Sequence, residues 1–516
     1  VTALLLLLWL AFFSRLSGRL RLGVIGAVLG GVALFVANFR IRGVSGDLLP
    51  ILDSRWAKPQ PPPLPKTAPV ETVASPPTAP SGGDSRASPS HLPDSVSPRA
   101  AGPDATAGVA PTGSRPAAEG KAKDDLTASG PSWPQFLGPN RDATVPGLRL
   151  ARDWTARPPK LVWRQPIGAA WSAFVIVDGF AITQEQRGDE ELVVAYALAT
   201  GRPLWSHSEK TRYDTVIAGV GPRATPSVAD GRVFAQGATG ILNALELRTG
   251  RKLWSRQVVA ENGGREPTWG QSPSPLVLEA RVIVSAGGTE GRSLVAYDAA
   301  TGEPVWAGGH DAGSYSSPQL VTLAGRPQVV LLGGASVAGY EPATGTLLWE
   351  HPWPSEQPNV AQPLPLPADR LLVSAGYGVG SKVIALAADD SSALRPSLVW
   401  ETPRLKSKFA NMVLHEGFVY GLDDGVLTCL DPATGERRWK AGRYGHGQLL
   451  LLGELLFVQT EDGEGVLIAP TPEALRELTR FTLLDGKTWN PPALSGARLL
   501  VRNDREAALY ELPLAE

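Results

Sequence analysis

Short groups of polar and aromatic residues recur along the chain, each just before a run of apolar residues. They lie at residues 171–172, 223–226, 269–273, 315–318, 359–363, 408–411, 446–448 and 489–491. Aromatic faces beside hydrogen-bonding groups are what ligand pockets use to hold and orient a molecule. The candidate ligand-binding residues are Trp171, Arg223, Trp269, Gln271, Tyr315, Asn359, Asn411, His446, Trp489 and Asn490. The alternative is that these groups only complete the hydrogen bonds of strand ends and ordered water.

Patterns of catalytic and metal-binding residues are absent from the sequence. Histidines 207, 310, 351, 415 and 446 include no pair at metal-ligand spacing, and no Gly-x-Ser-x-Gly motif occurs. The single cysteine, Cys429, lies in an apolar run and is expected to be a small buried residue. Residues 389–390 and 423–424 are acidic pairs in apparent turns, which favours solvated hairpin residues over a calcium loop. We therefore expect no metal site and no catalytic residue.

Composition excludes some partners and favours a repetitive fold. The 49 lysines and arginines nearly balance the 50 aspartates and glutamates, so the chain has no net positive charge that would attract nucleic acid. A chain of 516 residues is too long for one ordinary core unless its architecture repeats. Its 56 glycines, 47 prolines and 15 tryptophans fit many short strands and tight turns with a recurring aromatic residue.

The first 131 residues differ in composition from the rest. Residues 2–13 and 22–39 are apolar and are expected to span a membrane, although a cleaved signal peptide is the alternative for the first run. Arg15, Arg19 and Arg21 favour a cytoplasmic connector between them, which would place the following chain on the periplasmic side of a bacterial cell membrane. A juxtamembrane segment, 41–56, precedes a Pro/Ala/Ser-rich stretch, 57–131. This stretch is expected to be a disordered tether with a reach on the order of 50 Å.

One motif repeats through residues 132–516: an apolar strand, a Thr-Gly turn and a tryptophan. Full copies occupy 195–205, 244–254, 296–306, 339–349 and 429–439, and weaker copies begin at 383 and 466. The spacing of about 40 to 50 residues is typical of four-stranded propeller blades. An insertion at 471–478 has the capping pattern of a short surface helix.

The two ends of this region are expected to complete one blade together. Residues 507–512 form a half-copy without a following tryptophan, and 160–163 form an outermost strand without a preceding Thr-Gly. Pairing them would close a ring of eight blades and remove an exposed sheet edge. The repeated indoles are predicted to pack between neighbouring blades. They are Trp163, Trp205, Trp254, Trp306, Trp349, Trp400 and Trp439.

The string at 296–306, A-x-D-x-x-T-G-x-x-x-W, resembles the tryptophan-docking repeat of quinoprotein dehydrogenases and their non-enzymatic relatives. Residues 133–141 and 487–492 are similar to segments of bacterial pyrroloquinoline-quinone-like (PQQ-like) propeller repeat proteins. The resemblance implies an all-β, eight-bladed propeller. In such a ring, the ten candidate residues would meet at one mouth of the central channel.

The resemblance leaves several functions open, because a fold does not fix an activity. Family dehydrogenases usually hold their quinone beneath a ring formed by two adjacent cysteines, and they bind calcium. This chain has one cysteine and no acidic cluster, so it lacks both features. We therefore expect no cofactor, and a binding or scaffold module for a protein or envelope component rather than an enzyme. The alternatives are a PQQ-dependent alcohol or sugar dehydrogenase and a scaffold for outer-membrane protein assembly.

Overall fold

The computed structural model describes residues 17–56, 130–288, 290–353, 356–390 and 393–516. The predicted first span, 2–13, and nearly all of the predicted tether, 57–131, lie outside these residues. The eight-bladed propeller and its nearly all-β character are confirmed.

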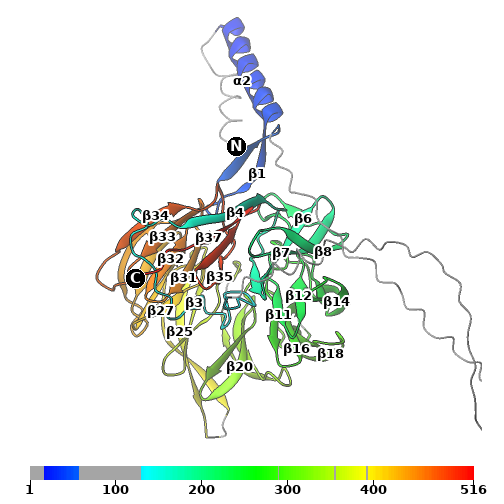
Figure 1. Ribbon diagram of the computed structural model, residues 1–516, viewed down its shortest axis with the longest axis vertical. Coiled ribbons are helices and arrows are strands. Elements are labelled where there is room, and N and C mark those ends of the chain that lie inside the picture. The colour runs from blue at the N-terminus through cyan, green and yellow to red at the C-terminus, as the bar shows by residue number, and fades with distance from the viewer. Residues whose placement is uncertain (1–16, 57–129, 289, 354–355, 391–392) are drawn as a thin grey trace, which may run out of the picture. The chain divides into compact units, whose positions relative to one another are not determined.

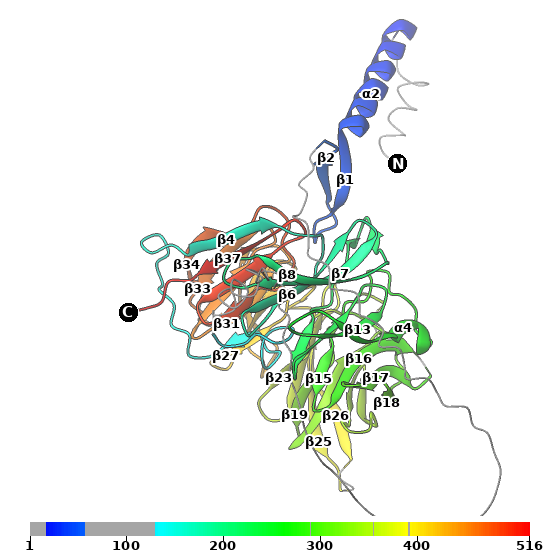
Figure 2. The ribbon, with the colours of Figure 1, turned by 45° about the vertical axis from the view of Figure 1, so that its right-hand side comes forward.

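Eight antiparallel sheets follow one another in chain order, each running from an inner to an outer strand (Figures 1 and 2). The first four blades are β5–β8 (Val175–Val177, Phe180–Arg187, Glu190–Ala197, Pro203–Glu209), β11–β14 (Ser227–Ala229, Arg232–Gln236, Ile241–Glu246, Lys252–Gln257), β15–β18 (Leu276–Leu278, Arg281–Gly288, Arg292–Asp298, Pro304–Gly308) and β19–β22 (Gln319–Leu323, Arg326–Leu332, Ser336–Tyr340, Leu347–Pro352). The next three are β23–β26 (Leu364–Leu366, Arg370–Ala375, Gly380–Ala388, Leu394–Thr402), β27–β30 (Val413–His415, Phe418–Asp423, Val426–Leu430, Arg437–Arg443) and β31–β34 (Gln448–Leu452, Leu455–Gln459, Glu464–Ile468, Glu477–Thr482). Short elements between them are β3 (Thr144–Val145), which pairs parallel with β31, the pair β9 (Asp214–Thr215) and β10 (Gly219–Val220), and α4 (Val258–Glu261).

The eighth blade joins the two ends of the propeller, as predicted. Strands β35 (Ala493–Ser495), β36 (Arg498–Arg502) and β37 (Glu506–Glu511) are completed by β4 (Lys160–Pro166), with Leu509 opposite Trp163. Figures 1 and 2 both show the teal β4 beside the red β37. The buried Arg502 ties this blade to the first, since its guanidinium donates to the Gln184 carbonyl at 2.9 Å and to the Gly168 carbonyl at 2.9 Å.

Six of the seven repeated tryptophans donate a hydrogen bond to the following blade, and their role in docking the blades stays a prediction. Trp205 donates its indole N–H to the Leu247 carbonyl of the next blade at 2.9 Å and lies against Gly250, where a Cβ would come within 2.4 Å of the ring. Trp163, Trp254, Trp306, Trp400 and Trp439 likewise donate to carbonyls of the following blade. Trp349 differs, since its indole donates to Gln328 within its own blade.

The predicted helix at 471–478 is wrong. Residues 472–474 form bends, and β34 begins at Glu477. The Thr471 carbonyl accepts the hydrogen bond of Trp439 at 2.8 Å, so the insertion provides the docking carbonyl that a Thr-Gly turn supplies elsewhere. Tertiary contact therefore overrides the local capping pattern.

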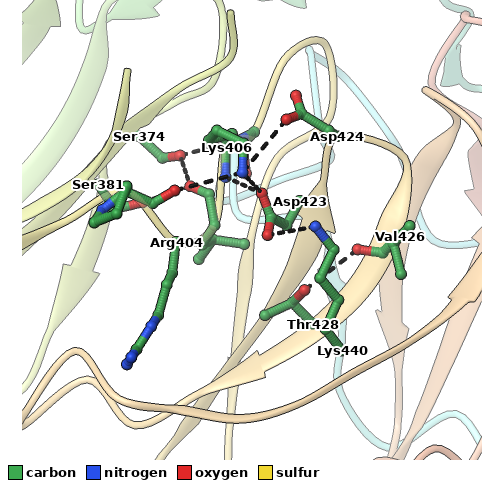
Figure 3. Close-up of polar contacts among 12 residues, drawn as sticks. Ser374, Ser381, Arg404, Lys406, Asp423, Asp424, Val426, Thr428 and Lys440 are labelled. Atoms are coloured by element: carbon green, nitrogen blue, oxygen red, sulfur yellow. Dashed lines mark hydrogen bonds and ion pairs between the residues drawn. The ribbon is translucent and has the colours of Figure 1, made fainter. Parts of the chain in front are cut away.

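Asp423 is also not the solvated turn residue that the sequence predicts. Its side chain is fully buried and receives the ammonium groups of Lys406 at 2.5 Å and Lys440 at 2.7 Å (Figure 3). Burial raises the pKa of Asp423, but the hydrogen bonds from both lysines outweigh this and hold the pKa below its ordinary value. Its neighbour Asp424 is more exposed and contacts Lys406 at 3.3 Å.

The residues before position 57 form a helix and a hairpin. Helix α2, Gly18–Asn38, is long and apolar enough to cross a membrane, although a signal sequence would have the same character. It begins before the predicted start at residue 22, so Arg19 and Arg21 lie in its first turn rather than in a connector. The juxtamembrane segment folds into β1 (Phe39–Val44) and β2 (Pro50–Ser54), which were not predicted.

Candidate functional site

A pocket lies where the inner ends of all eight blades meet. It encloses about 840 Å³ of empty space, including its open mouth. Seven of the sixteen lining side chains are aromatic, and no carboxylate or cysteine is among the sixteen. The lining residues are Phe136, Trp171, Ala218, Arg223, Trp269, Ser272, Tyr315, Ser317, Pro358, Val360, Tyr377, Phe409, Asn411, Gln448, Trp489 and Pro491.

Six of the ten candidate residues line this pocket. They are Trp171, Arg223, Trp269, Tyr315, Asn411 and Trp489. Repetition explains why: each follows an outer strand and precedes the inner strand of the next blade, so the same position recurs around the ring. Their role in ligand binding remains a prediction.

The other four candidates are buried beside the pocket and have partners within the protein. Gln271 donates to the Ser285 carbonyl at 2.6 Å, and Asn490 donates to the Ser172 carbonyl at 2.8 Å. Asn359 accepts the indole N–H of Trp353 at 3.0 Å. His446 lies at the rim, with its ring 5.6 Å from that of Phe409 in an edge-to-face contact. Gln271, Asn359 and Asn490 thus make hydrogen bonds within the protein of the kind that the alternative predicts, and their role in ligand binding stays a prediction.

The aromatic rings of one side of the pocket form a continuous surface. Trp489 lies between Trp171 and Phe409, at 4.9 Å from each ring centroid. The ammonium of Lys487 sits 4.0 Å from the Trp489 ring and 4.4 Å from the Trp171 ring, which are cation–π distances. Burial lowers the pKa of Lys487 to about 8.

Arg223, which precedes the second blade, supplies a second buried cation at the pocket. Its guanidinium lies 4.5 Å from the centroid of Tyr213 and donates to the carbonyls of Ala218 and Gly219 at 2.6 and 2.9 Å. Burial lowers the pKa of Arg223 to about 10. These contacts hold the group rigidly at the pocket wall.

Two polar atoms of the pocket have no hydrogen-bond partner among the described residues. They are the indole nitrogen of Trp171 and the hydroxyl of Tyr377, both of them buried. A buried polar group without a partner costs free energy, so both groups would gain from a hydrogen bond.

The segment before β3 closes the propeller axis beneath the pocket. Phe136 lines the pocket, and the fully buried Arg141 donates to the Pro318 carbonyl at 2.7 Å and the Ser274 carbonyl at 3.4 Å. These carbonyls belong to two different blades, so Arg141 links them at the axis. The similarity of residues 133–141 to propeller proteins drew attention to this segment. The segment lies outside the repeats, so their spacing did not indicate that it would lie at the axis.

At the mouth, the turn between β1 and β2 contacts the propeller. The Gly46 N–H donates to Glu461 at 2.6 Å, and Asp47 lies 3.0 Å from the ring nitrogen of His446. Sequence reasoning missed Phe136, Tyr377, Lys487 and Glu461. Tyr377 and Glu461 lie in turns between strands rather than before inner strands, so the repeated spacing could not indicate them.

The residues of the pocket do not fit a calcium-bound quinone. Among the described residues, no three His, Cys, Asp or Glu side chains are grouped to hold a metal ion. Cys429 is buried in the sixth blade, as predicted, and burial raises its pKa to about 11. We therefore derive no redox step at this site.

Comparison with solved structures shows the same fold. The structure of BamB from Moraxella catarrhalis aligns with a TM-score of 0.51 at 17% identity, covering 69% of this chain and 99% of that one. Quinohemoprotein alcohol dehydrogenase from Comamonas testosteroni aligns with a TM-score of 0.54 at 14% identity, covering 77% and 84%. At such identities the similarity concerns the fold alone.

Similar sequences come from both branches of the propeller proteins. Outer membrane protein assembly factor BamB of Xanthomonas campestris is 34% identical over 88 residues, 17% of this chain and 21% of that protein. Quinoprotein alcohol dehydrogenase PedH of Pseudomonas putida is 25% identical over 189 residues, 34% of this chain and 30% of that protein. The chain thus matches less than a third of the length of either relative.

The family comparison covers more of the chain. The PQQ_2 family model, described as outer membrane protein assembly factor BamB, matches residues 153–272 and 189–441. Together these matches contain all seven docking tryptophans. The chain therefore belongs to the PQQ_2 family of β-propeller proteins.

Proposed function

We propose that this chain is a membrane-held, extracytoplasmic binding module that takes a segment of a protein or envelope component into its axial pocket. The observation that carries the proposal is the pocket itself, which combines seven aromatic side chains with the unpartnered Trp171 indole and Tyr377 hydroxyl. Such a surface gains free energy by burying an apolar group and orients it by a few hydrogen bonds. The family description and the apolar helix α2 support a module held at the envelope.

Two alternatives are favoured by the relatives. Quinoprotein alcohol dehydrogenases are among the similar proteins, which supports a dehydrogenase acting on an alcohol or sugar. The pocket argues against it, because it offers no carboxylate for a calcium ion. BamB proteins support a role in outer-membrane protein assembly, and that role would be one form of the proposed binding function.

Photo-crosslinking from inside the pocket tests the proposal. Benzoylphenylalanine in place of Tyr315 should form an adduct with a second protein in native membranes, because this position lines the pocket. The matched control is the same probe at Leu398, an exposed residue of the outer strand β26. The additional substitution Trp269→Ala should remove the Tyr315 adduct. Adducts from Leu398 alone, or from neither position, would contradict an axial binding site.

A further inference from the structure

The turn of the juxtamembrane hairpin occupies the mouth of the axial pocket. Lys408 donates to the Gly46 carbonyl at 2.7 Å, and Lys487 donates to the Val44 carbonyl at 2.9 Å. The Gly46 N–H in turn donates to Glu461 at 2.6 Å. Three side chains of the propeller thus bind main-chain groups of this turn, which a peptide of another sequence would also present.

These three side chains contact residues that line the pocket. The ammonium of Lys408 lies 4.3 Å from the Tyr377 ring, and that of Lys487 lies 4.0 Å from the Trp489 ring. Glu461 accepts the Trp489 indole N–H at 2.9 Å and the His446 N–H at 3.0 Å. The polar rim is therefore fixed by the same aromatic residues that line the pocket, so it is a built site rather than a chance surface contact.

Two features of the turn match the rim in shape and charge. A Cβ at Gly46 would come within 2.0 Å of the His446 ring and 2.8 Å of its Cβ, so only glycine fits. The next residue, Asp47, pairs with the His446 ring nitrogen at 3.0 Å. The hydrogen bond with His446 lowers the pKa of Asp47, which favours its charged form in the docked state.

We propose that the rim of Lys408, His446, Glu461 and Lys487 is a binding site for a glycine–carboxylate peptide turn, and that the juxtamembrane hairpin is its intramolecular occupant. An external segment of the same chemistry binds only when the hairpin leaves. This deepens the proposed function, on which it rests, by giving the class of ligand and the means by which access to the pocket is controlled.

Covalent attachment makes the hairpin a strong competitor. A tethered ligand acts at an effective concentration in the millimolar range, so it weakens the apparent affinity of any free ligand for the same site. Gly46 is eight residues beyond Asn38, the end of α2. Eight residues span at most roughly 26 to 29 Å. While the hairpin is docked, the mouth of the axial pocket therefore lies within that distance of the end of α2. The hairpin thereby couples ligand access to the position of the propeller at the membrane.

Peptide binding to the full chain in lipid nanodiscs tests this proposal. The probe is a fluorescein-labelled, cyclised peptide of residues 39–54, and fluorescence anisotropy measures its affinity. The substitution Gly46→Val should expel the hairpin by steric conflict with His446 while leaving every propeller residue unchanged. The probe should then bind at least about tenfold more tightly than to the unsubstituted chain.

The matched control is Gly43→Ala in the same hairpin. A Cβ there meets the Lys487 nitrogen at 3.5 Å, an ordinary contact, so the affinity should equal that of the unsubstituted chain. A probe peptide that itself carries Gly46→Val should not bind. Melting temperatures should agree among the three chains, which shows that the propeller is intact.

Equal probe affinities for the unsubstituted and Gly46→Val chains, or no binding to the latter, would overturn the turn site. That result would leave the proposed function standing if Tyr315 still forms its adduct. Tight binding of the probe to the Gly46→Val chain, together with absence of the Tyr315 adduct from that same Gly46→Val chain, would instead support the turn site and contradict the broader function.

Discussion

A chain that ends at Leu494 is expected to be insoluble, because the truncation removes two strands of the blade that closes the ring. Without β36 and β37, strand β4 has no partner, and Arg502 no longer links the eighth blade to the first. Unpaired edges of this kind pair with other chains and aggregate. Soluble yield and size-exclusion chromatography measure the effect.

The comparison is a chain from Ser132 to Glu516, which keeps every blade. It should be soluble and melt in one cooperative transition, since the strand pairs that close the ring lie within it. Equal solubility of the two chains would contradict closure through the pairing of Trp163 with Leu509.

The substitution Asp423→Ala is expected to have the largest effect of any single change in the sixth blade. It would leave the ammonium groups of Lys406 and Lys440 without the buried carboxylate that binds both of them. Breaking a buried charge pair by removing one partner costs about 3 kcal/mol or more. Because both lysines are partly exposed, we expect a loss of about 2 to 3 kcal/mol in the free energy of unfolding, measured by urea denaturation.

Its neighbour provides the control and a pH test. Asp424→Ala should cost less than about 1 kcal/mol, because this carboxylate is 42% exposed and its ion pair is screened by water. The pKa of Asp423 is lowered on folding, so its contribution is complete above the ordinary value of 3.8 and is lost as the pH falls through the lower folded value. The difference between the unsubstituted and Asp423→Ala chains should therefore shrink in acid. Equal losses from the two substitutions would contradict a buried ion cluster.

Repetition made the fold predictable from the sequence. A Thr-Gly turn and a tryptophan at constant spacing identify each blade, since the glycine lies against the indole of the preceding blade as Gly250 does on Trp205. The unpaired half-copies at the two ends then required a shared blade. The same periodicity placed residues such as Trp171 and Trp489 around the axis, which is why part of the candidate site was found.

Contacts that no repeated pattern marks were not predictable from the sequence. The hairpin turn at Gly46 contacts Glu461, a separation of 415 residues, and no local pattern marks either one. Asp423 was misread because an acidic pair beside a turn has the same sequence whether it is solvated or bound by two lysines. Phe136 lies outside the repeats, so its place in the pocket follows only from the fold.

One measurement tests most directly whether the propeller is a binding module or a dehydrogenase. The purified chain is titrated with pyrroloquinoline quinone and calcium, and reduction of an artificial electron acceptor is then followed with alcohols or sugars as substrates. A dehydrogenase needs its cofactor held and polarised by a cation, and the pocket lining provides no carboxylate ligand for one. We predict neither tight quinone binding nor dye reduction. Stoichiometric quinone binding with substrate-dependent dye reduction, lost on Arg223→Ala or Trp269→Ala, would contradict the account and identify the protein as a dehydrogenase.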